Sequence, residues 1–291
     1  MPWVEVFRSR QRADCEQRAF LLFALGFAAE IQEQEDGFAL LVAGESAAAA
    51  RVHLADSELE ARRVAPAPPP LRVHRHAWIG CVGYAAVLLI AAYCTGQNWL
   101  DRDWQSLGAL RGTMARTGEW WRVVTALMLH ADLGHLLANV GFGIFFGYFA
   151  GQTVGAGLAW FGTVVAAALG NLIDAALMPI QQVSVGASTA VFATLGLLTA
   201  YSWRRRGANA RAKWAYRGAP LVAGIALLAL TGSGGENTDV LAHLSGFAAG
   251  LGIGLVYAFT SIPDRSGWKS QWLAGGTAVL LVIGAWWIAL S

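Results

Sequence analysis

Charged residues are scarce in this chain of 291 residues, where Asp, Glu, Lys and Arg make up 14% of the sequence, against about 25% in an average globular protein. The scarcity is uneven, because residues 1–75 carry 20 of the 40 charged side chains and only one of the 13 tryptophans. This split excludes a single soluble domain, and the many aromatic residues exclude a disordered chain. It favours a small soluble module followed by a polytopic membrane domain.

Three further absences narrow the possible functions. The three cysteines, Cys15, Cys81 and Cys94, are an odd number without metal-ligand spacing, so we expect no disulfide framework. We also expect no metal and no cofactor. The net charge of +2 comes without a basic stripe, so no nucleic-acid partner is expected. Residues 1–12 lack the apolar run of a signal peptide.

The N-terminal module, residues 1–63, has the pattern of a small soluble α+β domain. Alternating and helical spacings predict the order strand, helix, strand, strand, helix at residues 2–9, 10–26, 27–35, 38–43 and 45–63. Residues 64–76 include the run Pro66-Ala-Pro-Pro-Pro70, which predicts a stiff linker.

Apolar segments long enough to cross a hydrocarbon core of ~30 Å follow the linker. There are seven, at residues 77–95, 133–150, 156–177, 186–203, 218–232, 239–260 and 271–290. Small residues interrupt several of them, as is common where membrane helices pack closely. The fold class is therefore an all-α polytopic membrane protein with a soluble N-terminal domain.

The short loops that carry Lys and Arg set the expected orientation. Those before the first span, after the fourth and after the sixth are basic, whereas residues 178–185 and 233–238 contain no Lys or Arg. We therefore expect the N-terminus in the cytoplasm and the C-terminus outside. The long first outer loop, 96–132, departs from the rule with four arginines, and its four tryptophans indicate that it lies partly in the membrane interface.

Polar side chains inside apolar spans are costly and are candidates for function. They form three clusters, at residues 130–139, 186–189 and 242–246. Each cluster opens a span that enters from the outer side, so all three lie at similar depth and can line one cavity.

The chemistry of these clusters suggests acyl transfer. Ser188 needs a base to take its proton, and His243 is the candidate. His135 and Asn139 are four residues apart on one helix face, where both can donate to a developing oxyanion. Asp239 lies one turn before His243 and points toward the loop, so a Ser-His dyad is the simpler arrangement.

Small residues support the pairing of the two helices. Gly246, Gly250 and Gly254 lie on the face of His243, and such a face lets helices approach closely. Phe192, one turn after Ser188, can then stack on the His243 ring and fix its orientation.

Each feature also has an ordinary explanation. A lone Gly-x-Ser commonly caps a helix, and a glycine stripe commonly serves packing alone. His243 could be a satisfied core residue or part of a proton relay, and His130 could bond only to loop backbone. Arg122, after two tryptophans, is most simply an interfacial anchor.

Taken together, the motifs resemble those of the rhomboid intramembrane serine proteases over about residues 77–260. The resemblance rests on Trp121-Arg122, His130-x4-His135-x3-Asn139, Gly186-x-Ser188 and Ala242-His243-x2-Gly246-x3-Gly250. It implies a six-helix catalytic core, followed in residues 261–291 by a loop and a seventh transmembrane helix. Small cytosolic domains like residues 1–63 occur on some bacterial members.

The resemblance also implies roles for individual residues. Ser188 would be the nucleophile and His243 the general base, with an oxyanion hole made by the Ser188 backbone amide, His135 and Asn139. The family usually has Gly after the nucleophile, so Thr189 is expected to add bulk where substrate and oxyanion must fit. Many members have Tyr where this chain has Phe192.

We therefore predict an intramembrane serine endopeptidase that cleaves transmembrane segments of other proteins within the lipid bilayer. The expected location is a bacterial cytoplasmic membrane, with the active site opening to the outer face. The Gly-rich residues 231–237 could cap the cavity. Two alternatives remain at this stage: a catalytically weak or inactive relative that binds membrane clients, and a transporter or proton channel that uses the histidines.

Overall fold

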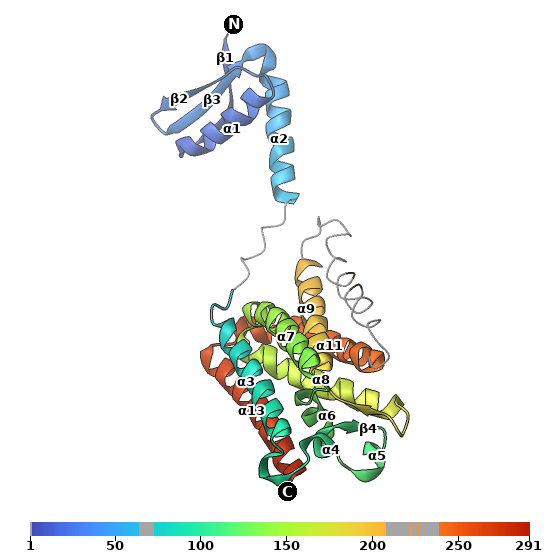
Figure 1. Ribbon diagram of the computed structural model, residues 1–291. Helices are drawn as coiled ribbons and strands as arrows, with labels where there is room; N and C mark the ends of the chain where they lie inside the picture. The colour runs from blue at the N-terminus through green and yellow to red at the C-terminus, as the bar shows by residue number, and fades with distance from the viewer. Residues whose placement is uncertain (1, 64–72, 208–221, 223–225, 227–238) are drawn as a thin grey trace. The chain divides into compact units, whose positions relative to one another are not determined.

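The computed structural model (Figure 1) describes residues 2–63, 73–207, 222, 226 and 239–291. The chain divides into two compact units, Met1–Pro68 and Pro69–Ser291, each of which is considered by itself.

The N-terminal unit contains one three-stranded antiparallel sheet with the strand order β1-β3-β2. Its elements are β1 Trp3–Ser9, α1 Arg12–Ala24, β2 Ala29–Gln34, β3 Gly37–Ala43 and α2 Ala47–Arg63. One apolar core joins the buried face of α1 at Cys15 and Leu22 to Leu40 of β3 and Leu54 of α2. The alternation of the strands places these apolar side chains on a single face.

Among the described residues of the second unit, five helices are long and apolar enough to cross a membrane. They are α3 Ala77–Gly96, α7 Leu133–Val154, α8 Ala156–Leu177, α11 Val240–Thr260 and α13 Trp268–Leu290. Each coincides with one of the seven spans expected from the sequence. Their exposed faces carry large apolar side chains such as Phe145, Leu172 and Leu280, as lipid contact requires.

The remaining two expected spans have different outcomes. Residues 186–203 correspond to α9, Ser188–Gly207, which is helical but less apolar because it contains several hydroxyl residues and ends in three arginines. The expected span at 218–232 and the expected cap at 231–237 lie outside the described residues. The six-plus-one helix count therefore stays a prediction.

Helix α9 packs closely against α11. A side chain on Gly250 of α11 would overlap the carbonyl oxygen of Ala193 on α9, and one on Gly254 would overlap that of Leu197. In the other direction, a side chain on Gly196 would overlap the carbonyl of Phe247. The glycine stripe thus brings the two backbones into contact, which confirms the close approach expected from the sequence.

The first long loop is folded into short elements that pack on the helices (Figure 1). They are η2 Trp99–Asp101, α4 Trp104–Gly108, β4 Leu110–Arg111, α5 Met114–Thr117, α6 Arg122–Thr125 and η3 Ala126–Met128. Trp104 is buried against Trp286 of α13, with ring centroids 4.5 Å apart. Strand β4 pairs with β5, Val183–Ser184, which lies just before α9. The loop therefore supports the start of α9.

The glycine contact gives a stability prediction. Gly250→Ala should destabilise the protein by about 1–3 kcal/mol, because overpacking a tight interface forces the backbones apart. Thermal unfolding of the purified protein in detergent measures this effect, at about 2–4 °C for each kcal/mol.

Gly252→Ala is the matched control, since it lies on the same helix and none of the described residues comes within 4 Å of an added Cβ. It should be neutral or slightly stabilising. Equal unfolding temperatures for the two variants would contradict the packing account.

Candidate active site

Gly186 brings the Ser188 hydroxyl and the His135 ring together. Its φ of +138° lies in a region that favours glycine. An added Cβ would lie 2.8 Å from Cε1 and Nε2 of His135 and 3.6 Å from Oγ of Ser188. The imidazole of His135 and the hydroxyl of Ser188 therefore face the same small space, which only a glycine leaves open.

His130 holds the segment that precedes Ser188. The Ala187 amide donates a long hydrogen bond of 3.5 Å to Nε2, and Nδ1 lies 3.2 Å from the Met128 carbonyl oxygen. With Nε2 accepting, we assign the proton to Nδ1, which donates to Met128. Burial, and next the charge of nearby His135, lower the pKa of His130 to about 4. The ring therefore stays neutral at physiological pH. Only a neutral imidazole can accept a hydrogen bond at Nε2, because both nitrogens of the charged ring carry a proton.

His135 and Asn139 lie in the first turns of α7, which Asp132 caps by accepting a hydrogen bond of 2.8 Å from the His135 amide. The Asn139 side chain is buried and donates to the His135 carbonyl oxygen at 3.0 Å. Tyr84 of α3 holds the backbone carbonyl of Asn139 from the other side, at 2.9 Å. One N–H of the Asn139 amide is thus used within its own helix, and the amide has a second N–H to donate.

His243 is buried, with 7% of its surface exposed, and stacks on Phe192 of α9. The two ring centroids are 4.5 Å apart and the rings are tilted, with an interplanar angle of 32°, so the expected contact between the rings is present. Phe192 follows Ser188 by one turn on the same face of α9. His243 therefore lies over the face of α9 that carries Ser188. Its Nδ1 has no hydrogen-bond partner among the described residues.

Thr189 does not lie where its bulk was expected to matter. Its side chain is 3% exposed, and its methyl carbon faces Gly170 of α8 and Gly246 of α11. Added Cβ atoms at those glycines would lie 3.1 Å and 2.9 Å from it. The expectation of crowding at the substrate site is therefore wrong, because glycines on two neighbouring helices accommodate the threonine.

Arg122 is not an interfacial anchor. Its side chain is 4% exposed and donates to the carbonyl oxygens of Ser106 and Ala109, each at 2.8 Å. It also pairs with Glu119 at 2.9 Å, and this hydrogen bond lowers the pKa of the Glu119 carboxyl. Arg122 thus connects α6 to α4 inside the loop. This role requires the loop to fold back so that the two helices lie close together.

Asp174 of α8 is a candidate that the sequence reasoning missed. It is 0% exposed, and neither carboxylate oxygen has a hydrogen-bond partner among the described residues. Asp239 lies near it. Asp239 itself caps α11 by accepting from the Ala242 amide at 3.0 Å, one turn before His243. A lone carboxyl inside an apolar span was the signal that could have identified Asp174.

The described residues hold no group of three His, Cys, Asp or Glu side chains arranged to bind a metal ion. The polar groups that do converge are a hydroxyl, imidazoles and an amide. This set can support proton transfer and hydrogen bonding to a developing oxyanion.

The buried Asp174 gives a second stability prediction. Asp174→Asn keeps the size of the side chain but removes an ionisable carboxyl that is buried without a hydrogen-bond partner among the described residues. We expect a gain of about 1 kcal/mol, seen as an unfolding temperature higher by about 2–4 °C. Asp101→Asn, at an exposed loop position, is the control and should change nothing. A lower unfolding temperature for Asp174→Asn would show that the carboxylate is needed for stability.

Comparison with known proteins places this site in a family. The model of the Rhomboid domain matches residues 117–259, which include His130, His135, Asn139, Ser188 and His243. Rhomboid-like protease 1 of Toxoplasma gondii is 30% identical over 61% of this chain and 60% of its own length. Rhomboid-like protease 3 of the same organism is 28% identical over 63% of this chain and 68% of its length.

A plant protein is similar as well. Rhomboid-like protein 11, chloroplastic, of Arabidopsis thaliana is 29% identical over 50% of this chain and 55% of its length. The match to Rhomboid-like protease 1 covers less than two thirds of that relative. The matched domain, the relatives and the five apolar helices agree: the chain is an integral, multi-pass membrane protein, and its residues 117–259 are a domain of the rhomboid family.

Proposed function

We propose that this protein is an intramembrane serine endopeptidase that cleaves transmembrane segments of other membrane proteins. The observation that carries the proposal is the convergence of Ser188 and His135 across Gly186, with His243 stacked on Phe192 one turn further along α9. The names of the relatives from Toxoplasma gondii support the same class of activity.

In this proposal, the Ser188 oxygen attacks the scissile carbonyl carbon while His243 accepts the hydroxyl proton. The His243 imidazolium then gives that proton to the leaving amine. Water next attacks the acyl-enzyme ester, with His243 again acting as the base, and releases the carboxylate product and free Ser188. The stack on Phe192 keeps the His243 ring in one orientation through these steps.

The oxyanion hole of the proposal uses three donors. Ser188 is the first residue of α9, so its backbone N–H has no partner within the helix and lies at the positive end of the helix dipole. His135 faces the same space across Gly186, and Asn139 has a second amide N–H to donate. Donors fixed in place in this way stabilise charge that develops in the transition state.

His130 acts in the proposal as a positioning residue. It binds the Ala187 amide, while the Gly186 amide donates to the Ala126 carbonyl oxygen at 3.0 Å. These two bonds fix the segment that carries Ser188 against the first loop, so the nucleophile enters the reaction already oriented.

We further propose the arrangement of the chain in its membrane. Residues 1–63 form a cytoplasmic α+β domain, residues 64–76 a linker, residues 77–260 a six-helix catalytic core, and residues 261–291 a loop and a seventh helix. The basic loops support this orientation, which makes the active site open to the outer face. The relatives reported above are eukaryotic, so the bacterial location stays a prediction.

A second candidate function is the binding of membrane clients without cleavage. It is favoured by the free Nδ1 of His243, which has no partner among the described residues. In many hydrolases a third group orients the base through that atom. Labelling by a fluorophosphonate probe separates the two candidates, because only an activated Ser188 reacts.

The test of the main proposal is cleavage of a transmembrane substrate in detergent or in vesicles. Ser188→Ala and His243→Ala should each lower kcat by roughly 1000-fold or more, since the nucleophile and base act as a unit. Ser202→Ala, further along α9, is the matched control and should cleave normally. Cleavage by Ser188→Ala at the rate of the original protein would refute the assignment.

The separate N-terminal unit gives a further prediction. A chain that starts at Leu71 should keep its activity toward a transmembrane substrate within about twofold, because none of the proposed catalytic groups lies in residues 1–63. The rate per active site, titrated with the fluorophosphonate probe, measures this directly. A complete loss of activity in a correctly folded, truncated protein would assign the N-terminal unit a part in catalysis.

A further inference from the structure

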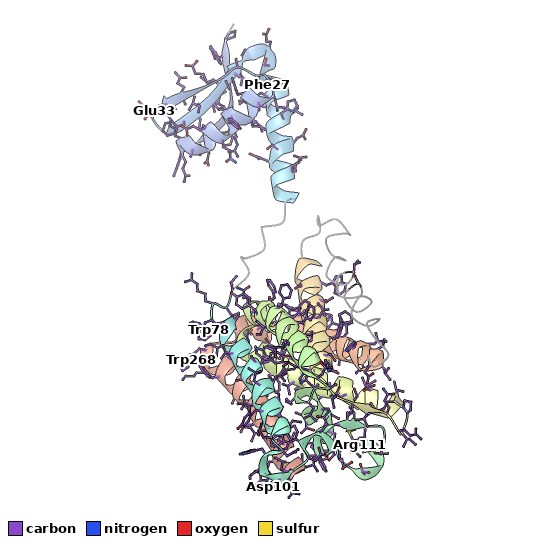
Figure 2. All side chains as sticks on the ribbon, viewed as in Figure 1. Phe27, Glu33, Trp78, Asp101, Arg111 and Trp268 are labelled. Atoms are coloured by element: carbon purple, nitrogen blue, oxygen red, sulfur yellow. The ribbon has the colours of Figure 1, made fainter. Side chains whose placement is uncertain are left out.

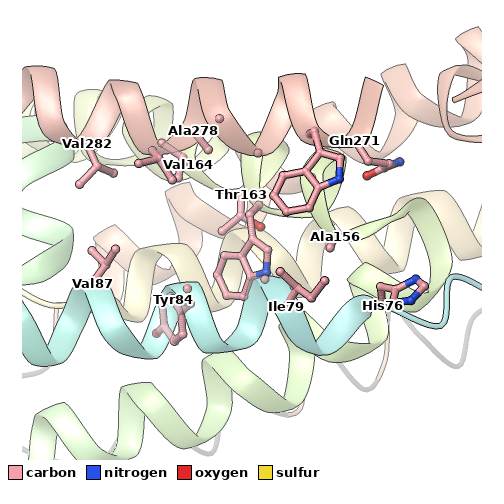
Figure 3. A pocket seen from close by; sticks show the side chains of 18 of the residues that line it. His76, Ile79, Tyr84, Val87, Ala156, Thr163, Val164, Gln271, Ala278 and Val282 are labelled. Carbon is pink, nitrogen blue, oxygen red and sulfur yellow. The ribbon is translucent and has the colours of Figure 1, made fainter. Parts of the chain in front are cut away.

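A large groove lies between α3 and α13 (Figure 3). Its volume is about 1480 Å³, and α8 contributes its floor through Trp160, Thr163 and Val164. In Figure 3, His76 and Gln271 lie toward one end, while Val87 and Val282 lie toward the other. The two helices also begin at the same end of the unit, where Trp78 and Trp268 are labelled in Figure 2.

The groove has the length of one membrane leaflet. On α3 it extends from His76 to Leu88, which is roughly 18 Å at 1.5 Å per residue. Half of a hydrocarbon core of ~30 Å is ~15 Å. Two glycines in its walls, Gly83 and Gly276, have no atom of the described part of the chain within 4 Å of an added Cβ, and this leaves open space beside them. The length and the open walls fit an acyl chain.

The basic side chains of the groove lie at one end. Among the described residues that line it, none is Asp or Glu, whereas Arg75 and His76 lie at the start of α3. Both are exposed, and no ion pair of Arg75 occurs among the described residues. Trp268 and Trp272 are also exposed there, at 70% and 60%, as aromatic residues at a membrane interface commonly are.

We propose that this groove binds an anionic phospholipid. The acyl chain lies between α3, α8 and α13, and the phosphate meets Arg75 and His76 at the mouth. Basic pockets between transmembrane helices are known sites for anionic head groups. An amphiphile has one charged end and one apolar end, as the groove does. A transmembrane helix with polar groups at both ends would not match this one-sided distribution.

The far end of the groove borders the segments that hold Ser188. Leu127 and Met128 of η3 line it, and so do Ala187 and Ala190 on either side of the nucleophile. A bound acyl chain therefore packs against the same backbone that fixes the candidate active site. The lipid site itself does not depend on the proposed proteolysis, and lipid binding can be measured in the Ser188→Ala variant as well.

The first experiment tests the apolar part of the site. The full-length protein, purified in detergent, is titrated with phosphatidylglycerol or phosphatidylcholine, and bound lipid is counted by native mass spectrometry. Gly276→Phe should lower the retained phosphatidylglycerol at least tenfold by filling the groove. Gly284→Phe is the matched control on the same helix, because it too has open space but does not line the groove, and it should bind lipid normally.

The second experiment tests the charged end. The original protein should prefer phosphatidylglycerol to phosphatidylcholine, and Arg75→Gln should reduce that preference about fivefold, as expected for one basic residue near a membrane surface. Arg265→Gln removes an exposed charge that does not line the groove and should leave the preference intact. Glycerol phosphate, which lacks acyl chains, should not displace the bound lipid.

Two results would overturn the proposal. One is equal lipid retention by Gly276→Phe, Gly284→Phe and the original protein, which would place bound lipid elsewhere on the surface. The other is unchanged lipid retention by Gly276→Phe together with loss of substrate cleavage, which would make the groove a site for a substrate helix. If the protein cleaves no substrate at all, the lipid counts still decide the inference.

Discussion

Contact between the backbones of α9 and α11 is the constraint on which the candidate site depends. Gly250 and Gly254 face carbonyl oxygens of α9, and Gly196 faces one of α11, so no side chain separates the two helices along this line. Dispersion forces drive such association in a membrane, where the hydrophobic effect between helices is absent. The same closeness carries the His243 ring onto Phe192. Widening this interface would separate the base from the helix that bears the nucleophile.

A second constraint fixes the approach to Ser188. The segment before α9 is bonded to the first loop at Ala126 and His130, and Gly186 leaves space for His135. The first loop is in turn braced internally by Arg122, whose buried guanidinium spans two carbonyl oxygens and a carboxylate. A buried guanidinium without partners would destabilise the loop, whereas one with this many hydrogen-bond partners stabilises it.

The sequence predicted those features that follow from periodicity along one helix. The spacing of Gly246 and Gly250 placed them on the face of His243, and the spacing of Ser188 and Phe192 predicted the ring contact. It failed where a role depends on a second segment. Thr189 is accommodated by Gly170 of α8, and Arg122 bonds to residues more than ten positions earlier. Neither partner can be identified from the local pattern, because the chain must fold before they meet.

The segment Ala126–Met128 connects the two functional regions. On one side Ala126 accepts from the Gly186 amide, and the Met128 carbonyl binds His130. On the other side Leu127 and Met128 line the groove between α3 and α13. A change in what fills the groove would thus act on the segment that positions Ser188, without any contact between lipid and substrate. Coupling of this kind requires only that Ala126–Met128 contact the groove and the segment before Ser188 at the same time. The segment is short and bonded at both ends, so a shift on one side also moves the other side.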